Sequence, residues 1–290
     1  MRGFQIAKAG GLVVPVAALL LLGASGCAGG KNPFTGKPGS VFEALIPRKP
    51  GEIAKDAVNP SVDVDKRRRA LEQLSSAKWG GEKPYLRLYR VYVDNPGDDD
   101  TIISVCVRAL GRHGGPQDVP RLTKMLSKSS YDPPVYVRWE AAKALQRIHD
   151  RKAISPLISA AVNDQEPDVR MAAVQALGQY DEPAVFDALV GALNDSHFAV
   201  RHGALESLKL LTGQDYGDDI RPWITWGKVN RRDLFAGKQP YTWQPYDKPR
   251  GLWDKVRFWR KKEPVLPRAP TGLQQATVDS DEQAAKLTEQ

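Results

Sequence analysis

The four histidines of the chain are the first residues to examine for catalytic or metal-binding chemistry. His113, His149, His197 and His202 lie in no motif with metal-ligand spacing, and the sequence has no His-Glu dipeptide. His202 and Glu206 are four residues apart, so on a helix they share a face and predict a simple side-chain contact. Gly-rich phosphate loops and Gly-x-Ser-x-Gly motifs are also lacking. We therefore expect no catalytic residue, no bound metal and no cofactor.

Two further features could carry chemistry but have simpler structural interpretations. Asp98, Asp99 and Asp100 precede an expected helix that starts near Thr101, and acidic residues favour a helix N-terminus. Calcium binding by these three carboxylates is the alternative. Cys106 lies within an apolar pattern of helical period, which predicts a small buried core residue.

Cys27 is the residue whose surroundings predict a chemical modification. Arg2 and Lys8 form a short basic region, and an apolar stretch follows over residues 10–22. This stretch is shorter than the ~20 apolar residues that a membrane-spanning helix needs. Small residues at positions 23–26 then lead to Cys27. The order basic, apolar, small is typical of a secretory signal.

The segment Ala24-Ser25-Gly26-Cys27 resembles a bacterial lipobox, although Ala24 stands where that family prefers Leu. The resemblance implies that Cys27 is acylated and becomes the first mature residue, and that residues 1–26 are a cleaved signal peptide. More than one acyl chain is needed for stable anchoring. Ala28, in place of Asp, favours the outer membrane if the cell has one. The alternatives are a plain signal peptide or an uncleaved N-terminal anchor.

Residues 27–61 are rich in Gly, Pro and Lys and predict an acylated, flexible tether. Such a composition buries too little apolar surface to fold alone. A small apolar island at residues 41–46 is a candidate for docking on the folded domain.

A short motif recurs through the middle of the chain and defines its folded part. Residues 137–145, 169–177 and 200–208 align without gaps, each with Val-Arg at the start and Leu seven residues after the Arg. Weaker copies cover residues 67–74 and 103–110, the second with Ile in place of Arg. The motif anchors fall at positions 67, 103, 138, 170 and 201, which is the spacing of a helical repeat.

Each middle copy continues into a second apolar pattern of helical period, over residues 116–127, 154–162 and 185–193. Gly111 and Gly178 stand just after the first helices, where a left-handed turn favours glycine. A helix pair of this kind buries its apolar face only by stacking on its neighbours. The sequence predicts an all-α fold, an α-solenoid of about five helix pairs over residues 62–230.

These copies resemble HEAT repeats, in the short bacterial form also called the phycobilisome-lyase-like repeat. The resemblance covers about residues 62–230 and is specific for fold but not for function. It implies that the Val packs between helices and that the Arg joins a ladder of polar contacts along neighbouring repeats. Arg67, Arg138, Arg170 and Arg201 are thereby assigned to structure, and a ligand-binding row of arginines is the alternative.

The end of the repeat region has its own signature. A Leu-Thr-Gly-x-Asp turn at residues 211–215 precedes a helix with Trp223 and Trp226 on one face, which resembles the terminal repeat of exported bacterial HEAT proteins. The first interpretation is a cap that closes the core. The alternative is a surface on which a peptide or glycan stacks.

The C-terminal part is expected to be a basic aromatic extension at residues 231–262 and a disordered tail at residues 263–290. Within the extension, a helix would present an apolar face beside cations, which is the pattern of an interfacial amphipathic helix. The alternative is packing along the solenoid. The expected membrane-contact residues are Leu252, Trp253, Lys255, Val256, Arg257, Trp259 and Arg260.

The formal net charge of +8 is compatible with a nucleic acid, an anionic membrane or an acidic partner, and the export signal argues against nucleic acid. We expect a lipid-anchored scaffold of the cell envelope that binds a protein or peptide along the second helices. A bilin-lyase-like or other HEAT-repeat enzyme is the alternative, because the resembling family includes lyases that hold a chromophore. The expected partner-binding residues are Arg121, Lys124, Lys128, Trp223 and Trp226.

Overall fold

The computed structural model describes residues 49–96, 99–127, 132–244 and 266–273. The chain divides into the units Met1–Lys49 and Pro50–Gln290, and the helices described here belong to the second unit. The predicted signal peptide and Cys27 lie outside the described residues. Within the described part of the chain, no helix is long and apolar enough to cross a membrane.

The described secondary structure is helical throughout, apart from one isolated β-bridge. The α-helices are α2 (Pro50–Val58), α3 (Val64–Ser76), α4 (Lys83–Asp94), α5 (Asp100–His113), α6 (Val119–Leu126), α7 (Val135–Arg147), α8 (Ile154–Asn163), α9 (Pro167–Leu177), α10 (Pro183–Ala192), α11 (Phe198–Thr212) and α12 (Ile220–Val229). Short 3-10 helices η2 (Lys78–Gly81), η3 (Pro116–Asp118) and η4 (Arg151–Ala153) precede α4, α6 and α8.

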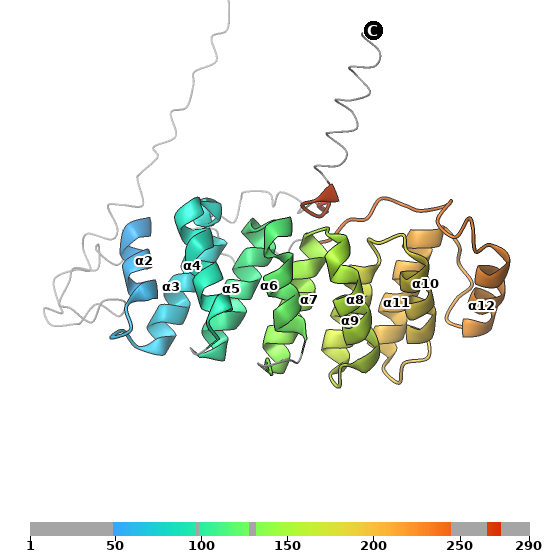
Figure 1. Ribbon diagram of the computed structural model, residues 1–290, viewed down its shortest axis with the longest axis horizontal. Helices are drawn as coiled ribbons and strands as arrows, with labels where there is room; N and C mark the ends of the chain where they lie inside the picture. Colours follow the sequence, from blue (N-terminus) through green and yellow to red (C-terminus); the bar gives the residue numbers. More distant parts are fainter. Residues whose placement is uncertain (1–48, 97–98, 128–131, 245–265, 274–290) are drawn as a thin grey trace, which may run out of the picture. The chain divides into compact units, whose positions relative to one another are not determined.

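The helices from α3 to α12 form two layers, and successive pairs stack in chain order (Figure 1). The first helices pack on one another in the order α3, α5, α7, α9, α11, and the second helices in the order α4, α6, α8, α10, α12. The second helices α4, α6, α8 and α10 also pack against the first helix of the next pair, as α8 does against α9. The predicted all-α solenoid of about five helix pairs is confirmed for the described residues.

Helix α2 extends the stack before the predicted boundary at residue 62. Ile53 and Ala57 are four residues apart, so they share one face of α2, and both are buried. The hydroxyl of Tyr92 on α4 donates to the carbonyl of Ala57 at 2.6 Å. Pro50 is the first residue of α2, a position where proline costs no hydrogen bond. The flexible tether predicted over residues 27–61 is therefore wrong for residues 50–58.

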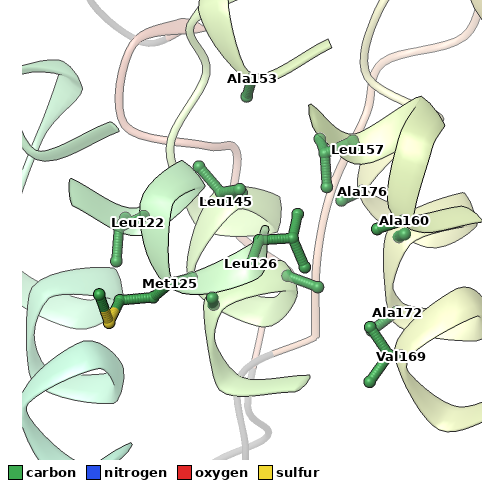
Figure 2. Packing of buried hydrophobic residues seen from close by; sticks show 14 of the residues in the cluster. Leu122, Met125, Leu126, Leu145, Ala153, Leu157, Ala160, Val169, Ala172 and Ala176 are labelled. Carbon is green, nitrogen blue, oxygen red and sulfur yellow. The ribbon is translucent and has the colours of Figure 1, made fainter. Parts of the chain in front are cut away.

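The core runs through the stack as one cluster of apolar side chains, and Figure 2 shows a part of it around α6 to α9. Leu145 and Leu177, which hold the same place in two repeats, are fully buried, and so is Cys106. A Cβ built on Gly111 would lie 2.6 Å from the Cβ of Ala144, so glycine lets α5 and α7 approach closely. The left-handed turns predicted at Gly111 and Gly178 are wrong, because positive φ occurs among the described glycines at residues 213 and 217.

After α12 the chain turns back along the C-terminal ends of the first helices. Residues 234–244 and 266–273 form this return path and are called the C-terminal strap below. Gln239 donates its N–H to the carbonyl of Leu210 on α11 at 2.8 Å, and Thr271 donates to the carbonyl of Arg147 on α7 at 2.9 Å. The disordered tail predicted over residues 263–290 is therefore wrong for residues 266–273, which dock on the stack.

Candidate functional site

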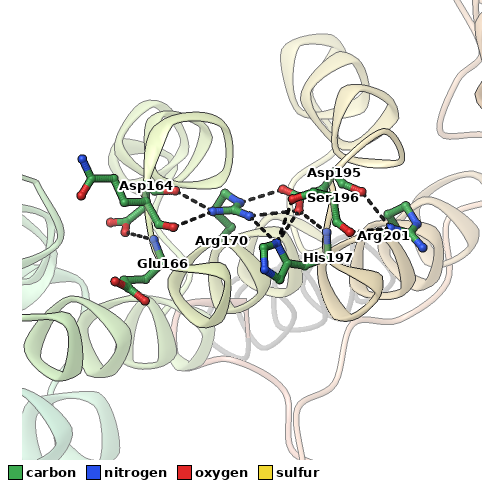
Figure 3. A network of polar contacts seen from close by, with 8 residues as sticks. Asp164, Glu166, Arg170, Asp195, Ser196, His197 and Arg201 are labelled. Atoms are coloured by element: carbon green, nitrogen blue, oxygen red, sulfur yellow. Dashed lines mark hydrogen bonds and ion pairs between the residues drawn. The ribbon is translucent and has the colours of Figure 1, made fainter.

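The repeat arginines form a ladder that joins neighbouring helix pairs (Figure 3). Arg170 donates from Nε and Nη2 to the carboxylate of Asp195 in the next loop, at 2.7 and 3.0 Å. Its Nη1 donates to the carbonyls of Asp164 and Gln165 in the preceding loop, at 2.8 and 3.1 Å. Arg138 makes the equivalent bonds to Asp164, at 2.8 and 2.9 Å, and to the carbonyl of Pro133.

Each carboxylate of the ladder also organises the start of the following helix. Asp164 accepts the backbone N–H of Glu166 at 3.0 Å, and Asp195 accepts that of His197 at 2.8 Å. The hydrogen bond from Arg170 holds the pKa of Asp195 below its ordinary value. The same bonds raise the pKa of Arg138 and of Arg170 above their ordinary values. Arg138 and Arg170 therefore each link the loop before their own helix to the loop before the next first helix.

The other motif positions depart from this pattern. Arg201 keeps the two bonds to the preceding loop, at 2.8 Å from the carbonyl of Asp195 and 3.1 Å from that of Ser196. Ile103 replaces the arginine on α5 and is fully buried in the core. Arg67 on α3 is half-buried; hydrogen bonds from Thr101 lower the pKa of Asp99, and the charge of Arg67 adds a smaller effect. The regular ladder thus covers the pairs from α7 to α11.

The predicted partner-binding cations of α6 differ in availability. Arg121 donates to both carboxylate oxygens of Asp94 on α4, at 2.8 and 2.9 Å, and lies 3.7 Å from Asp118. Lys124 is exposed, and Lys128 lies outside the described residues. An ion pair that the sequence did not reveal lies beneath, at 2.7 Å between the fully buried Asp118 and the partly buried Arg90. Of the three predicted cations, Arg121 is therefore used in contacts between neighbouring second helices, and Lys124 is available to a partner.

The Trp-x-x-Trp helix closes the last repeat. Trp223 is fully buried, and its Nε1 donates to the carbonyl of Gly217 at 2.9 Å. Its ring meets Tyr216 edge-on, at 5.1 Å between ring centroids, and meets Trp226 at 6.5 Å. Trp226 is half-buried and lies 5.9 Å from Phe186 of α10. Trp223 has the position of a cap, and only Trp226 of the two retains a partly exposed ring.

A largely apolar groove lies between the last two second helices, α10 and α12. Its volume is about 410 Å³, and its walls come from α10 and α12. Gly227 lets the helices approach, because a Cβ there would lie 2.5 Å from the Phe186 ring. The sequence did not predict this groove, and Gly227 on an otherwise bulky helix is the feature that could have indicated it. The lining residues are Phe186, Asp187, Val190, Gly191, Ile220, Ile224, Gly227, Lys228 and Arg231.

The groove has a charged rim on one side. Arg231 donates to both oxygens of Asp187, at 2.6 and 2.7 Å, and Lys228 is exposed nearby on α12. Ile224 is 40% exposed, so an apolar side chain from outside can reach it. This arrangement suits an apolar anchor that is flanked by polar or charged groups.

Three of the four histidines make structural contacts, and the fourth, His202, is exposed on α11. His113 bonds the carbonyl of Ser75 at 2.7 Å, His149 bonds Gln179 at 3.1 Å, and His197 lies 3.1 Å from Arg170. Burial lowers the pKa of His149 below its ordinary value. Among the residues that the structure covers, no group of three metal-ligating side chains is placed to hold an ion.

The structure describes part of the predicted acidic run but none of the predicted membrane-contact residues. Asp99 accepts the backbone N–H of Thr101 at 2.8 Å and caps α5, as predicted, while Asp98 lies outside the described residues. The predicted membrane-contact residues from Leu252 to Arg260 also lie outside them.

The strap brings together residues whose link the sequence did not reveal. Tyr241 donates its hydroxyl to the carbonyl of Gln175 on α9 at 2.6 Å and accepts from Nε2 of Gln146 on α7 at 3.0 Å. The Trp243 ring lies 5.1 Å from the Arg147 guanidinium, which is a cation–π distance. The strap therefore crosses from α11 over α9 to α7.

The fold defines this chain as a helical-repeat protein of the α-solenoid class. Residues 126–209 match the family model described as HEAT repeats. No curated protein matches the chain.

Solved structures similar to the chain include designed and natural proteins. A designed armadillo repeat protein in complex with the peptide (KR)4 has a TM-score of 0.45 and 16% identity, over 63% of this chain and 90% of that chain. A computationally designed armadillo repeat protein for modular peptide recognition has a TM-score of 0.42 and 15% identity, over 65% and 90%. Human deoxyhypusine hydroxylase in complex with glycerol has a TM-score of 0.29 and 21% identity, over 66% and 68%.

Proposed function

We propose that this protein is a membrane-tethered scaffold of the cell envelope that binds a protein or peptide partner and acts by binding, not by catalysis. The groove between α10 and α12 is the observation that most directly supports the binding of a protein or peptide. It combines an apolar wall with a charged rim on an exposed surface of the stack. An extended segment that inserts an apolar side chain between Val190 and Ile224 is the ligand that this surface fits.

The groove can be tested with one substitution and a matched control. Ile224→Glu places a charge in the apolar wall, and Val162→Glu places the same charge on α8 at a valine that is 61% exposed. Both variants and the parent protein are used for affinity capture from envelope extracts, followed by mass spectrometry. We expect one set of proteins with the parent and Val162→Glu that is lost with Ile224→Glu. The same set with all three proteins would exclude the groove.

The membrane tether is the second part of the proposal and rests on the sequence around Cys27. Acylation of Cys27 would hold the solenoid at the membrane surface. Metabolic labelling with a fatty acid should mark the parent protein but not Cys27→Ser. Equal labelling of both would contradict lipid attachment at this residue.

A further contact with anionic lipid is proposed for residues 248–262. Each Lys or Arg close to an anionic surface contributes about 1 kcal/mol, and salt screens this attraction. A soluble form lacking residues 1–27 should sediment with anionic liposomes, and removal of residues 248–262 should abolish that binding. Unchanged sedimentation after the removal would show that residues 248–262 do not bind the liposomes, and acylation of Cys27 would then be the proposed anchor that remains.

A further inference from the structure

Arg201, the last repeat arginine, makes only one of the two sets of hydrogen bonds that the other ladder arginines make among the described residues. Arg138 and Arg170 each bind the preceding loop through Nη1 and the carboxylate of the next loop through Nε and Nη2. Arg201 reproduces the first set of bonds. Within the described residues, no carboxylate reaches its Nε or Nη2. Among the described residues α11 is the last first helix of the stack, so none of them forms a following loop at the repeat spacing.

The helix surface around Arg201 is the one on which a further first helix would pack. On α9, Met171 and Val174 stand one and four residues after the repeat arginine. They lie 3.8 and 3.1 Å from a Cβ built on Gly203 of α11, so they form the contact between these helices. Their counterparts on α11 are His202 and Leu205, at the same spacing from Arg201. These two side chains therefore mark the open end of the first-helix layer.

This open end is aromatic, with His202 exposed and Leu205 half-buried against the core. Phe198 is 71% exposed, and its ring stacks on that of His202 with 5.7 Å between centroids and 10° between planes. The guanidinium of Arg201 lies 5.9 Å from the centroid of the Phe198 ring. Terminal repeats usually carry a polar outer face. An exposed aromatic beside a guanidinium with free donors instead suits a protein partner, since Arg and aromatic residues dominate binding energies at interfaces.

We propose that Phe198, Arg201, His202 and Leu205, here called the open rung, bind a partner protein that continues the ladder. The partner supplies an Asp or Glu from a loop, and the helix that follows this loop packs on His202 and Leu205. Its carboxylate accepts from Nε and Nη2 of Arg201, as Asp195 accepts from Arg170. A carboxylate is required because the planar guanidinium offers two parallel donors at the spacing of its two oxygens. The open rung lies on the first-helix layer and the groove on the second, so each is tested separately.

The chain itself provides a probe with the required chemistry. A synthetic peptide of residues 192–212 carries the loop with Asp195 followed by the sequence of α11, which is the element that packs on α9. The full-length protein is titrated with this fluorescent peptide and with its Asp195→Asn form. We expect the Asp195 peptide to bind about tenfold more tightly, because a charge-assisted bidentate contact is lost in the other.

Protein variants then locate the contact. Arg201→Gln should bind both peptides equally, and Arg201→Lys should retain only part of the preference because it cannot bind both oxygens in parallel. Arg221→Gln is the matched control, since Arg221 is an exposed arginine of α12 that pairs with Asp219. It should keep the full preference. Phe198→Glu changes an exposed side chain, so it leaves the fold intact and should weaken binding of both peptides.

Three results would overturn the proposal. Equal affinity of the parent protein for the two peptides would exclude carboxylate recognition. A preference that survives in Arg201→Gln would place the contact elsewhere. Self-association of the parent protein that is lost in Arg201→Gln, measured by sedimentation without peptide, would make a second copy of the chain the occupant in place of a different protein.

Discussion

Arg170 and Asp195 stand in successive repeats, and the guanidinium donates to both carboxylate oxygens at 2.7 and 3.0 Å. Both side chains are almost fully buried, with 10% and 12% of their surfaces exposed. The bond therefore ties α9 to the loop before α11 within a low-dielectric interface. Removal of one partner leaves the other charge without compensation, which costs more than the pair itself contributes.

Asp195→Ala should lower the free energy of unfolding by about 3 kcal/mol, the range found when one member of a buried ion pair is removed. Asp187→Ala provides the control, because the pair between Asp187 and Arg231 is exposed and should matter little. Urea unfolding of the two variants and the parent protein measures both effects. Equal changes in the two variants would mean that the ladder has no special role in stability.

The same carboxylate predicts how stability depends on pH. The hydrogen bond from Arg170 lowers the pKa of Asp195 in the folded protein below its ordinary value of 3.8, which applies to the unfolded chain. Folding is therefore favoured by the charged form, and this contribution is complete above 3.8 and lost as the pH falls through the folded pKa. The difference in unfolding free energy between the parent and Asp195→Asn should be largest near about pH 6 and shrink below about pH 4. A difference independent of pH would contradict the assignment.

The repeat register predicts which apolar side chains matter. Leu145→Ala and Leu177→Ala should each destabilise the fold by about 2–5 kcal/mol, since both residues are fully buried and the cavity cannot close completely. Val162→Ala on α8 is the control and should cost less than about 0.5 kcal/mol, because Val162 is exposed. Thermal or urea unfolding measures all three. A small change at either leucine would show that the helix is rotated from its assigned face.

The repeated part of the fold could be predicted from the sequence because the same residue types return at the same positions of each repeat. Arg138 and Arg170 could be assigned to a ladder, since the Val-Arg pair returns at nearly constant spacing and the structure gives both the same bonds. Their acidic partners were not recognised as such. Asp164 and Asp195 look like ordinary turn residues, and their contact with an arginine of the previous repeat is created by the stacking of helices.

The elements outside the repeat, namely α2, the strap and the groove, could not be predicted from the sequence. Helix α2 carries no repeat arginine or leucine, so its Ile53 and Ala57 gave too weak a signal against the surrounding Gly and Pro. The strap has an even weaker local signal. Tyr241 bonds Gln175 across 66 residues, and no spacing rule predicts such a contact. The groove likewise depends on the close approach of α10 to α12 and not on a motif.

The strap should open when Tyr241 is replaced. Tyr241→Phe removes the hydroxyl that donates to the carbonyl of Gln175 at 2.6 Å and accepts from Gln146 at 3.0 Å. The amide of Gln146 then lacks its partner at a partly buried site, so we expect a loss of about 1 kcal/mol in the local stability of the strap. Local opening is read by hydrogen exchange, because exchange follows the free energy of opening of each segment. Amides of residues 237–244 and 266–273 should exchange faster, while those of α7 and α9 keep their protection.

Tyr136→Phe is the matched control at an exposed tyrosine of α7 and should change neither region. The strap should exchange faster than the stack even in the parent protein. The informative quantity is therefore the difference in strap exchange between Tyr241→Phe and Tyr136→Phe. If the strap of Tyr241→Phe exchanges like that of the parent, the bridge between Trp243 and Arg268 and the stacking of Trp243 on Arg147 suffice to hold it in place.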